Sequence, residues 1–221
     1  LGFSGILFMT VLSYITNLFL SHGSIHNSIF LAVGFIAFLS ILKKKLFRKK
    51  IKLILLVSSV FFIGILMFKT HDDFFYYHFQ YTISLIEFKK IFGVGNLEHG
   101  FRTPSSIFYL NSLFYLPIIE RSLIHSGAIF YMIFTNVFLI EKIFNRLKNK
   151  KYDFLLILSL LSLLFVNTIF YRIAEHGTDR SALILIFILA IYYLEGINKK
   201  LTKINFKHYY QKILVTILLI I

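Results

Sequence analysis

The chain of 221 residues contains no cysteine, no tryptophan and only two prolines. The absence of cysteine excludes disulfide bonds and cysteine-ligated metal sites, although it does not identify the compartment. Acidic residues are also scarce, since ten Asp and Glu stand against 24 Lys and Arg and give a formal net charge of +14. Hydrophobic residues make up 57% of the chain. This composition is typical of a membrane protein and not of a soluble domain.

Apolar segments with few or no charges recur along the chain, with lengths near the roughly 20 residues that a helix needs to cross a bilayer. They are Leu1–Leu20, Ser28–Leu42, Leu53–Phe68, Leu123–Ile140, Phe154–Tyr171, Ser181–Leu194 and a segment starting at Ile213. We therefore expect an all-α fold, a polytopic bundle of six to seven transmembrane helices forming a single domain over residues 1–221. The first segment lacks the basic start and cleavage site of a signal peptide. The chain begins and ends inside apolar runs, so we expect it to be a piece of a longer polypeptide.

Positive charge is concentrated in three short runs between the apolar segments. Lys43–Lys52, Lys142–Lys151 and Lys199–Lys212 contain seven, five and five basic residues, 17 of the 24 in the chain. Short basic runs flanked by spans are typical of cytoplasmic loops and not of a nucleic-acid surface. The positive-inside rule places all three runs in the cytoplasm. By parity, residues 21–27, 69–122 and 172–180 then face the outer side of the membrane.

The outward segment 69–122 is expected to contain elements that lie along the membrane. In Asp73–Phe88 an apolar face recurs at spacings of three and four residues, which predicts an amphipathic helix. That face comprises Phe74, Tyr77, Tyr81, Leu85 and Phe88. The apolar piece Ile107–Ile119 cannot be a lone span, because the chain must cross an even number of times between two cytoplasmic runs. We expect it to lie in the interface or to dip in and return.

The stretch Thr70–His78, with sequence T-H-D-D-F-F-Y-Y-H, carries the main candidates for chemistry. Asp72 or Asp73 can act as a general base toward an acceptor hydroxyl at the membrane face. With His71 or His78, the two acids can also hold a divalent metal through oxygen and imidazole ligands. The alternative is structural, because Thr70 and Asp73 have the spacing of a helix N-cap and its third residue.

Two further outward loops carry candidate binding residues. The loop Gly93–Arg102 has three glycines in eight residues and brings Glu98, His99 and Arg102 toward the membrane. Its arginine has the planar fork that binds phosphate oxygens, and it can equally face lipid headgroups. The second loop is rich in charge and can complete a pocket with the acidic pair or simply connect two helices. Its candidates are Arg172, Glu175, His176, Asp179 and Arg180.

The order D-D-F-F-Y-Y-H, F-G-V-G-N-L-E-H-G-F and S-S-I-F-Y-L-N-S-L-F resembles a family of multi-span bacterial membrane proteins of surface-polysaccharide loci. The opening Gly2–Phe38 and the loop A-E-H-G-T-D fit that pattern as well. Members of the family are similar in layout to GT-C glycosyltransferases, which carry an acidic residue in a first large external loop and use polyprenyl-phosphate-linked sugars. In this chain the acidic loop follows the third apolar segment and not the first.

The resemblance implies a GT-C glycosyltransferase of cell-envelope polysaccharide synthesis, in the bacterial inner membrane. Asp72 or Asp73 would be the base, and Arg102, Arg172 or Arg180 would neutralise the phosphate of the donor. The partners would be the lipid bilayer, a polyprenyl-phosphate-linked sugar and a saccharide or lipid-linked acceptor. Three alternatives stay open: an O-antigen-type polymerase or ligase that relies on arginines, a transporter or flippase of lipid-linked saccharide, and a structural membrane subunit.

Overall fold

The computed structural model describes residues 2–43, 45–67, 72–97, 99–102, 104–169, 179–201 and 207–220. Within these residues the fold is all-helical, and the one β-type pairing is an isolated bridge between Leu116 and Glu120. The α-helices are α1 (Gly2–Asn17), α2 (Ser24–Leu42), α3 (Lys45–Leu66), α4 (Phe79–Glu87), α5 (Ser106–Ser112), α6 (Ser126–Lys148), α7 (Phe154–Ile169), α8 (Asp179–Leu201) and α9 (Lys207–Ile220). Each apolar segment predicted from the sequence coincides with a helix, which confirms the all-α class.

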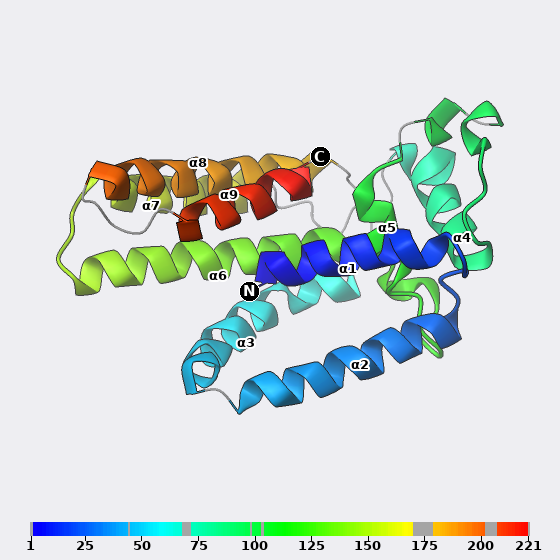
Figure 1. The fold of residues 1–221 in the computed structure, drawn as a ribbon, viewed down its shortest axis with the longest axis horizontal. Coiled ribbons are helices and arrows are strands. Elements are labelled where there is room, and N and C mark those ends of the chain that lie inside the picture. Colours follow the sequence, from blue (N-terminus) through cyan, green and yellow to red (C-terminus); the bar gives the residue numbers. More distant parts are fainter. Residues whose placement is uncertain are drawn as a thin grey trace.

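The helices run back and forth so that the basic runs gather at one end of the bundle (Figure 1). The α2–α3 turn, the α6–α7 turn and the C-terminal end of α8 lie toward the left of that view. We call this the basic end. The α1–α2 connection, α4 and α5 lie toward the right, and we call this the α4–α5 end. That the three runs share the cytoplasmic side of a membrane stays a prediction.

Acidic residues at the basic end pair with its cations. Lys50 of α3 contacts Glu141 of α6 at 2.8 Å, and Arg146 of α6 pairs with Asp153 at the start of α7. Lys142 lies 2.5 Å from Glu195 of α8, whose side chain is only 7% exposed. Each of these ion pairs links two helices or a helix and the residue that precedes the next one. The charged residues between the apolar segments therefore hold the helix ends together at the basic end.

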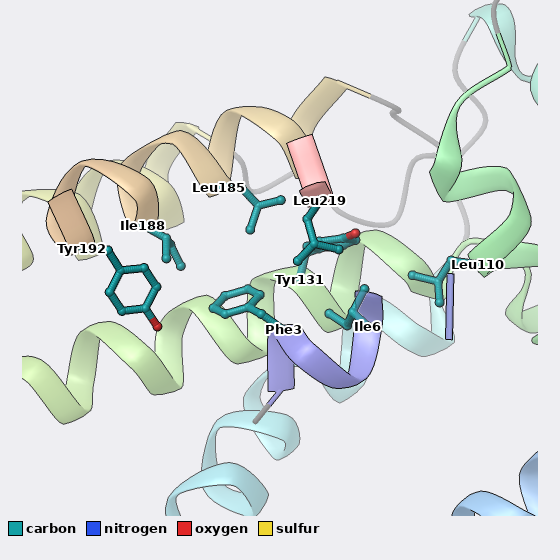
Figure 2. Packing of buried hydrophobic residues seen from close by; sticks show 8 residues of the cluster. All are labelled: Phe3, Ile6, Leu110, Tyr131, Leu185, Ile188, Tyr192 and Leu219. Atoms are coloured by element: carbon teal, nitrogen blue, oxygen red, sulfur yellow. The ribbon is translucent and has the colours of Figure 1, made fainter. Parts of the chain in front are cut away.

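The core of the bundle is built around α6. One cluster joins α3, α6, α7 and α8 through residues such as Val57, Ile133 and Ile184. A second joins α1, α5, α6, α8 and α9, and Figure 2 shows Phe3 and Ile6 of α1 on one side of this cluster and Leu185 and Ile188 of α8 on the other. Close van der Waals packing of this kind holds one helix against another, in water and in a bilayer alike.

Two of the described helices, α2 and α6, are long and apolar enough to cross a membrane. The apolar helices Gly2–Asn17, Phe154–Ile169 and Ser181–Ile197 are shorter. The two candidates differ in their surroundings, since α6 is largely buried by other helices whereas α2 is bare. Every residue from 31 to 40 in α2 is exposed, on all faces of the helix. Water is a poor solvent for such a surface, and lipid is a good one.

The predicted amphipathic helix is present, with one change. Helical structure runs from Asp72 to Glu87 and contains a π-helical turn over Phe74–His78 before α4. Phe74, Tyr81 and Leu85 are buried as the pattern predicts. The expected helix ran to Phe88, but α4 ends at Glu87 and the backbone of Phe88 is extended, so Phe88 lies outside the apolar face of the helix.

The helical part of the segment Ile107–Ile119 is buried, whereas its last residues, Pro117, Ile118 and Ile119, are exposed. All residues of α5 from Ile107 to Ser112 are buried, and the helix packs among α1, α4 and α6. Whether the segment lies in a membrane interface or dips into the membrane stays a prediction. The two prolines flank it, since Pro104 precedes α5 and Pro117 follows it. A proline outside a helix interior breaks no helical hydrogen bond.

Candidate functional site

A cavity of about 390 Å³ opens at the α4–α5 end. Its wall consists of Tyr81 from α4, the chain from Lys90 to Asn96, and Phe101, Arg102 and Pro104. Two of these residues are cations, and none of the described lining residues is acidic. The other described lining residues include the aromatic Tyr81, Phe92 and Phe101 and the glycines Gly93 and Gly95. A cavity with this lining suits an anion that carries an apolar or sugar-like group.

Lys90 is held in place by two tyrosines. Its Nζ donates hydrogen bonds to the hydroxyl of Tyr109 at 2.6 Å and to that of Tyr81 at 3.0 Å. The ring of Tyr14 stacks on that of Tyr109, with 3.7 Å between ring centroids. Burial, followed by the hydrogen bond with Tyr81, raises the pKa of Tyr109 well above its ordinary value. The phenol is therefore neutral at physiological pH and accepts the ammonium hydrogen bond as a fixed dipole.

The glycine loop positions Arg102. Gly93 has φ +82°, a left-handed conformation that favours glycine. A Cβ at Gly95 would lie 3.2 Å from Cγ and 3.3 Å from Cα of Arg102, so glycine lets the two segments approach. Arg102 Nε donates to the carbonyl of Gly95 at 3.1 Å. Both glycines therefore serve to bring the guanidinium to the cavity wall.

A buried polar network lies behind the cavity and connects α1, α2, α4 and α5. Asn17 Nδ2 donates to the carbonyls of Leu85 and Phe88 at the C-terminal end of α4, both at 3.3 Å. The N–H of Lys90 in turn donates to the carbonyl of Asn17 at 2.7 Å. Helix C-termini leave carbonyls without intrahelical partners, and here a side chain of α1 satisfies them. The cavity lysine is thus fixed to α1 through its own backbone.

His22 and Asn27 form the centre of that network. His22 Nδ1 lies 2.7 Å from Ser112 Oγ, and its Nε2 lies 3.1 Å from the carbonyl of Ser13. A carbonyl only accepts, so Nε2 carries the proton of the neutral ring and Nδ1 is an acceptor. The single proton of the Ser112 hydroxyl is then shared between Nδ1 and the carbonyl of Tyr109, which lies 2.9 Å from Ser112 Oγ. Asn27 Nδ2 faces the carbonyls of His22, Ser112 and Tyr115 at 2.8, 2.9 and 2.8 Å.

His22 is a neutral imidazole in the folded chain. It is 0% exposed, and burial lowers its pKa to about 4, with the neighbouring His26 ring as a second cause. The hydrogen bond to Ser13 opposes this lowering. An unfolded histidine titrates near pH 6.5. The unfolded chain therefore binds more protons between pH 6.5 and 4, and stability falls as pH drops through that window.

We expect this histidine to contribute a pH dependence of folding. Full stability should be present above pH 6.5, and about 3 kcal/mol should be lost by pH 4, because a tenfold change in a protonation equilibrium corresponds to about 1.4 kcal/mol. The measurement is thermal unfolding in detergent across this range for the wild type, His22→Gln and the control His26→Gln. The His22 variant should have the flatter profile. Identical slopes in all three proteins would contradict the assignment.

The structure does not bring all of the predicted site residues together at the cavity. Arg102 lines the cavity, whereas Asp72 and Asp73 do not. The acids precede Tyr81 by eight or nine residues in the same helical segment, a distance of about 12–14 Å along the helix axis. His78 is buried, with its ring 4.3 Å from that of Tyr77 and 5.2 Å from that of Phe108. His99 is exposed in a single 3₁₀ turn.

Most of the remaining site residues predicted from the sequence are not described by the structure. Thr70, His71, Glu98, Arg172, Glu175 and His176 lie outside the described residues. Asp179 and Arg180 begin α8. Over the described ranges, no group of three or more His, Cys, Asp or Glu side chains is placed to hold a metal ion. A metal site that uses His71 stays a prediction.

Sequence reasoning missed Lys90, Tyr109, His22 and Asn27 as parts of one site. The partners in each contact are far apart in the chain, as with His22 and Ser112 or Lys90 and Asn17. One available signal was the polar cluster S-H-G-S-I-H-N between two apolar segments, which is denser in hydrogen-bonding groups than a connector requires.

Comparison with known proteins gives a family but no activity. A family model described as "Domain of unknown function (DUF8201)" matches residues 2–221. No curated protein and no solved structure matches the chain.

Proposed function

The chain belongs to that DUF8201 family, and from the geometry of the cavity we propose that it is a membrane glycosyltransferase of the GT-C type. It transfers a sugar from a polyprenyl-phosphate-linked donor in the synthesis of cell-surface polysaccharide. The single observation that carries this proposal is the cavity at the α4–α5 end with Lys90 and Arg102 on its wall.

The two cations are suited to a phosphate group. An ammonium has three donors, and the tyrosines accept two from Lys90, so the third can reach a phosphate oxygen. Arg102 uses Nε on Gly95 and keeps its terminal nitrogens for bidentate binding. Phe101 and the exposed Phe92 on the same wall offer ring faces for a sugar or an isoprenoid unit.

The membrane part of the proposal is a bundle of six to seven spans in the bacterial inner membrane. It is supported by the apolar length of α2 and α6, by the bare surface of α2 and by the common position of the basic runs. If the positive-inside rule holds, the basic end is cytoplasmic and the cavity is external or periplasmic. The phosphate of a polyprenyl-linked sugar lies at a membrane surface, where this cavity would meet it.

The proposed chemistry is an inverting transfer. Asp72 or Asp73 removes the proton from the acceptor hydroxyl, whose oxygen then attacks the anomeric carbon of the donor. The bond from that carbon to the phosphate oxygen breaks, and the phosphate leaves with the electron pair. Lys90 and Arg102 stabilise the charge that develops on it. A base must come within hydrogen-bond reach of the acceptor, so the acidic pair and the cavity must approach each other when substrates bind.

The distance between the acids and the cavity favours one other candidate, an O-antigen-type polymerase or ligase. Such an enzyme would depend on cations, among them Arg172 and Arg180, and would not need Asp72 or Asp73. The two candidates share the lipid-phosphate substrate and differ in the residues that act on the acceptor.

The test is a transfer assay in proteoliposomes. The probes are hexoses linked to a short-chain polyprenyl phosphate, and release of the free polyprenyl phosphate is measured. For the transferase, Asp72→Asn or Asp73→Asn should lower kcat about 100-fold or more. Lys90→Gln and Arg102→Gln should raise KM and also lower kcat, because the two cations bind the donor phosphate and stabilise the charge that develops on it. Lys89→Gln, an exposed neighbour that does not line the cavity, should change neither.

Two outcomes would count against parts of the proposal. Full transfer by both aspartate variants, together with its loss in Arg172→Gln or Arg180→Gln, would select the polymerase or ligase. An unchanged KM in both Lys90→Gln and Arg102→Gln would contradict the cavity as the phosphate site.

A further inference from the structure

Ile118 lies in an unusual position at the tip of the turn that follows α5. Its side chain is 100% exposed, and its φ is +71°, a left-handed conformation that a β-branched residue rarely adopts. Glu120, two residues later, also has a positive φ, of +47°. The turn therefore combines backbone strain with full exposure of a large apolar side chain. Either feature alone is unfavourable in water.

The turn is held in this conformation from its base. The N–H of Glu120 donates to the carbonyl of Leu116 at 2.7 Å, and that of Ile119 donates to Pro117 at 2.8 Å. One residue earlier, the carbonyl of Tyr115 accepts a hydrogen bond from Asn27, which is 1% exposed. The surrounding structure thus fixes the turn and pushes its apolar tip outward.

The base of the turn lies against the beginning of α2, where other apolar side chains are also exposed. Ile25 and Ile29, on either side of the anchoring Asn27, are 77% and 58% exposed. The exposed surface continues along α2 through residues 31–40. The turn is therefore held at the N-terminal end of α2, whose apolar side chains are exposed on all sides.

A cation follows the apolar tip directly. Arg121 is about half exposed, lies 3.7 Å from Glu87 and has its guanidinium carbon 5.7 Å from the ring centre of Phe79. An apolar group beside an arginine matches the boundary of a bilayer, where acyl chains meet phosphate headgroups. The arginine can keep its charge at headgroup level while the isoleucines enter the hydrocarbon.

We propose that the turn Leu116–Glu120 inserts Ile118 and Ile119 into the phospholipid bilayer beside the N-terminal end of α2, as an interfacial wedge. The partner is the acyl-chain boundary of the outer leaflet. This inference rests on the multi-span arrangement within the proposed function, but not on glycosyl transfer. Within the segment Ile107–Ile119, the membrane contact is therefore made by the turn Leu116–Glu120 and not by the helix Ser106–Ser112, which is buried in the protein.

The absence of tryptophan makes the test direct, because a single introduced Trp is the only such reporter in the chain. The full chain is reconstituted in phosphatidylcholine nanodiscs whose acyl chains are brominated either near the headgroup or near the chain end. Ile118→Trp should emit at shorter wavelength than a water-exposed Trp and should be quenched more by the shallow bromines. Phe35→Trp, midway along α2, should be quenched more by the deep ones.

Asn149→Trp, in the exposed turn at the basic end, should be quenched by aqueous iodide and by neither lipid. Quenching of Ile118→Trp by iodide and not by lipid, with Phe35→Trp still quenched by lipid, would overturn the wedge and leave the spans intact. If Phe35→Trp is also quenched only by iodide, the multi-span arrangement fails as well. Should Ile118→Trp not fold, Ile118→Cys carrying an environment-sensitive dye gives the same readout, since the chain has no other cysteine.

Discussion

Asn27→Asp should cost about 4 kcal/mol of folding free energy or more, a large part of the roughly 5–15 kcal/mol that a protein has in total. The amide of Asn27 donates toward three carbonyls within 2.9 Å, those of His22, Ser112 and Tyr115. A carboxylate has nearly the same shape but can only accept, so it would place a buried charge against three acceptors. The change should separate the start of α2 from the end of α5.

Thermal unfolding in detergent, followed by retention of the folded monomer on gel filtration, measures the loss. The matched control is Asn149→Asp, because Asn149 is exposed and donates to only one carbonyl, that of Asn145. A surface change of this kind should stay within about 0.5 kcal/mol. If Asn27→Asp unfolds at the same temperature as Asn149→Asp, the network does not hold α2 to α5.

Glu195→Ala should have the second large effect, a loss of about 3–5 kcal/mol. Glu195 is almost fully buried between Lys142 and Arg146, at 2.5 and 3.6 Å, whereas the side chains of the two cations are themselves only 20% and 14% exposed. Its removal leaves a lysine ammonium in a site walled by the rings of Phe138 and Tyr192. A buried cation without its counter-ion is far more costly than a missing surface pair.

The control for this prediction is Glu141→Ala, which removes the more exposed pair with Lys50. Surface ion pairs are worth about 0–1 kcal/mol, so the variant should unfold close to the wild type. Chemical unfolding curves of both variants in the same detergent give the comparison. Equal losses would mean that the buried position of Glu195 adds nothing.

The sequence was sufficient for the helices because their signal is local. A run of uncharged apolar residues predicts a helix wherever it is long enough, and the seven predicted segments are helical. Their ends were less accurate. Helices α3 and α6 extend into the basic runs, to Lys45 and Lys148, since a helical backbone continues where hydropathy has already fallen.

The candidate site could be predicted only in part, for a physical reason. Arg102 was found because its glycine loop is a local motif, and the structure places it on the cavity wall. Lys90 could not be found in that way. Its importance comes from Tyr81, Tyr109 and Asn17, which three different helices bring to it. Burial of His22 and His78 was also hidden, since polar residues next to apolar segments are expected at the surface.

The central claim is that the cavity at the α4–α5 end binds the phosphate of a polyprenyl-linked saccharide. The most direct measurement is the affinity of the chain in nanodiscs for a short-chain polyprenyl monophosphate, compared among the wild type, Lys90→Gln and Lys89→Gln. A hydrogen bond to a charged group is worth about 1.5–3 kcal/mol, so Lys90→Gln should bind roughly 10- to 100-fold more weakly. Lys89→Gln should bind as the wild type does. Equal affinity in all three proteins would contradict the assignment of the cavity.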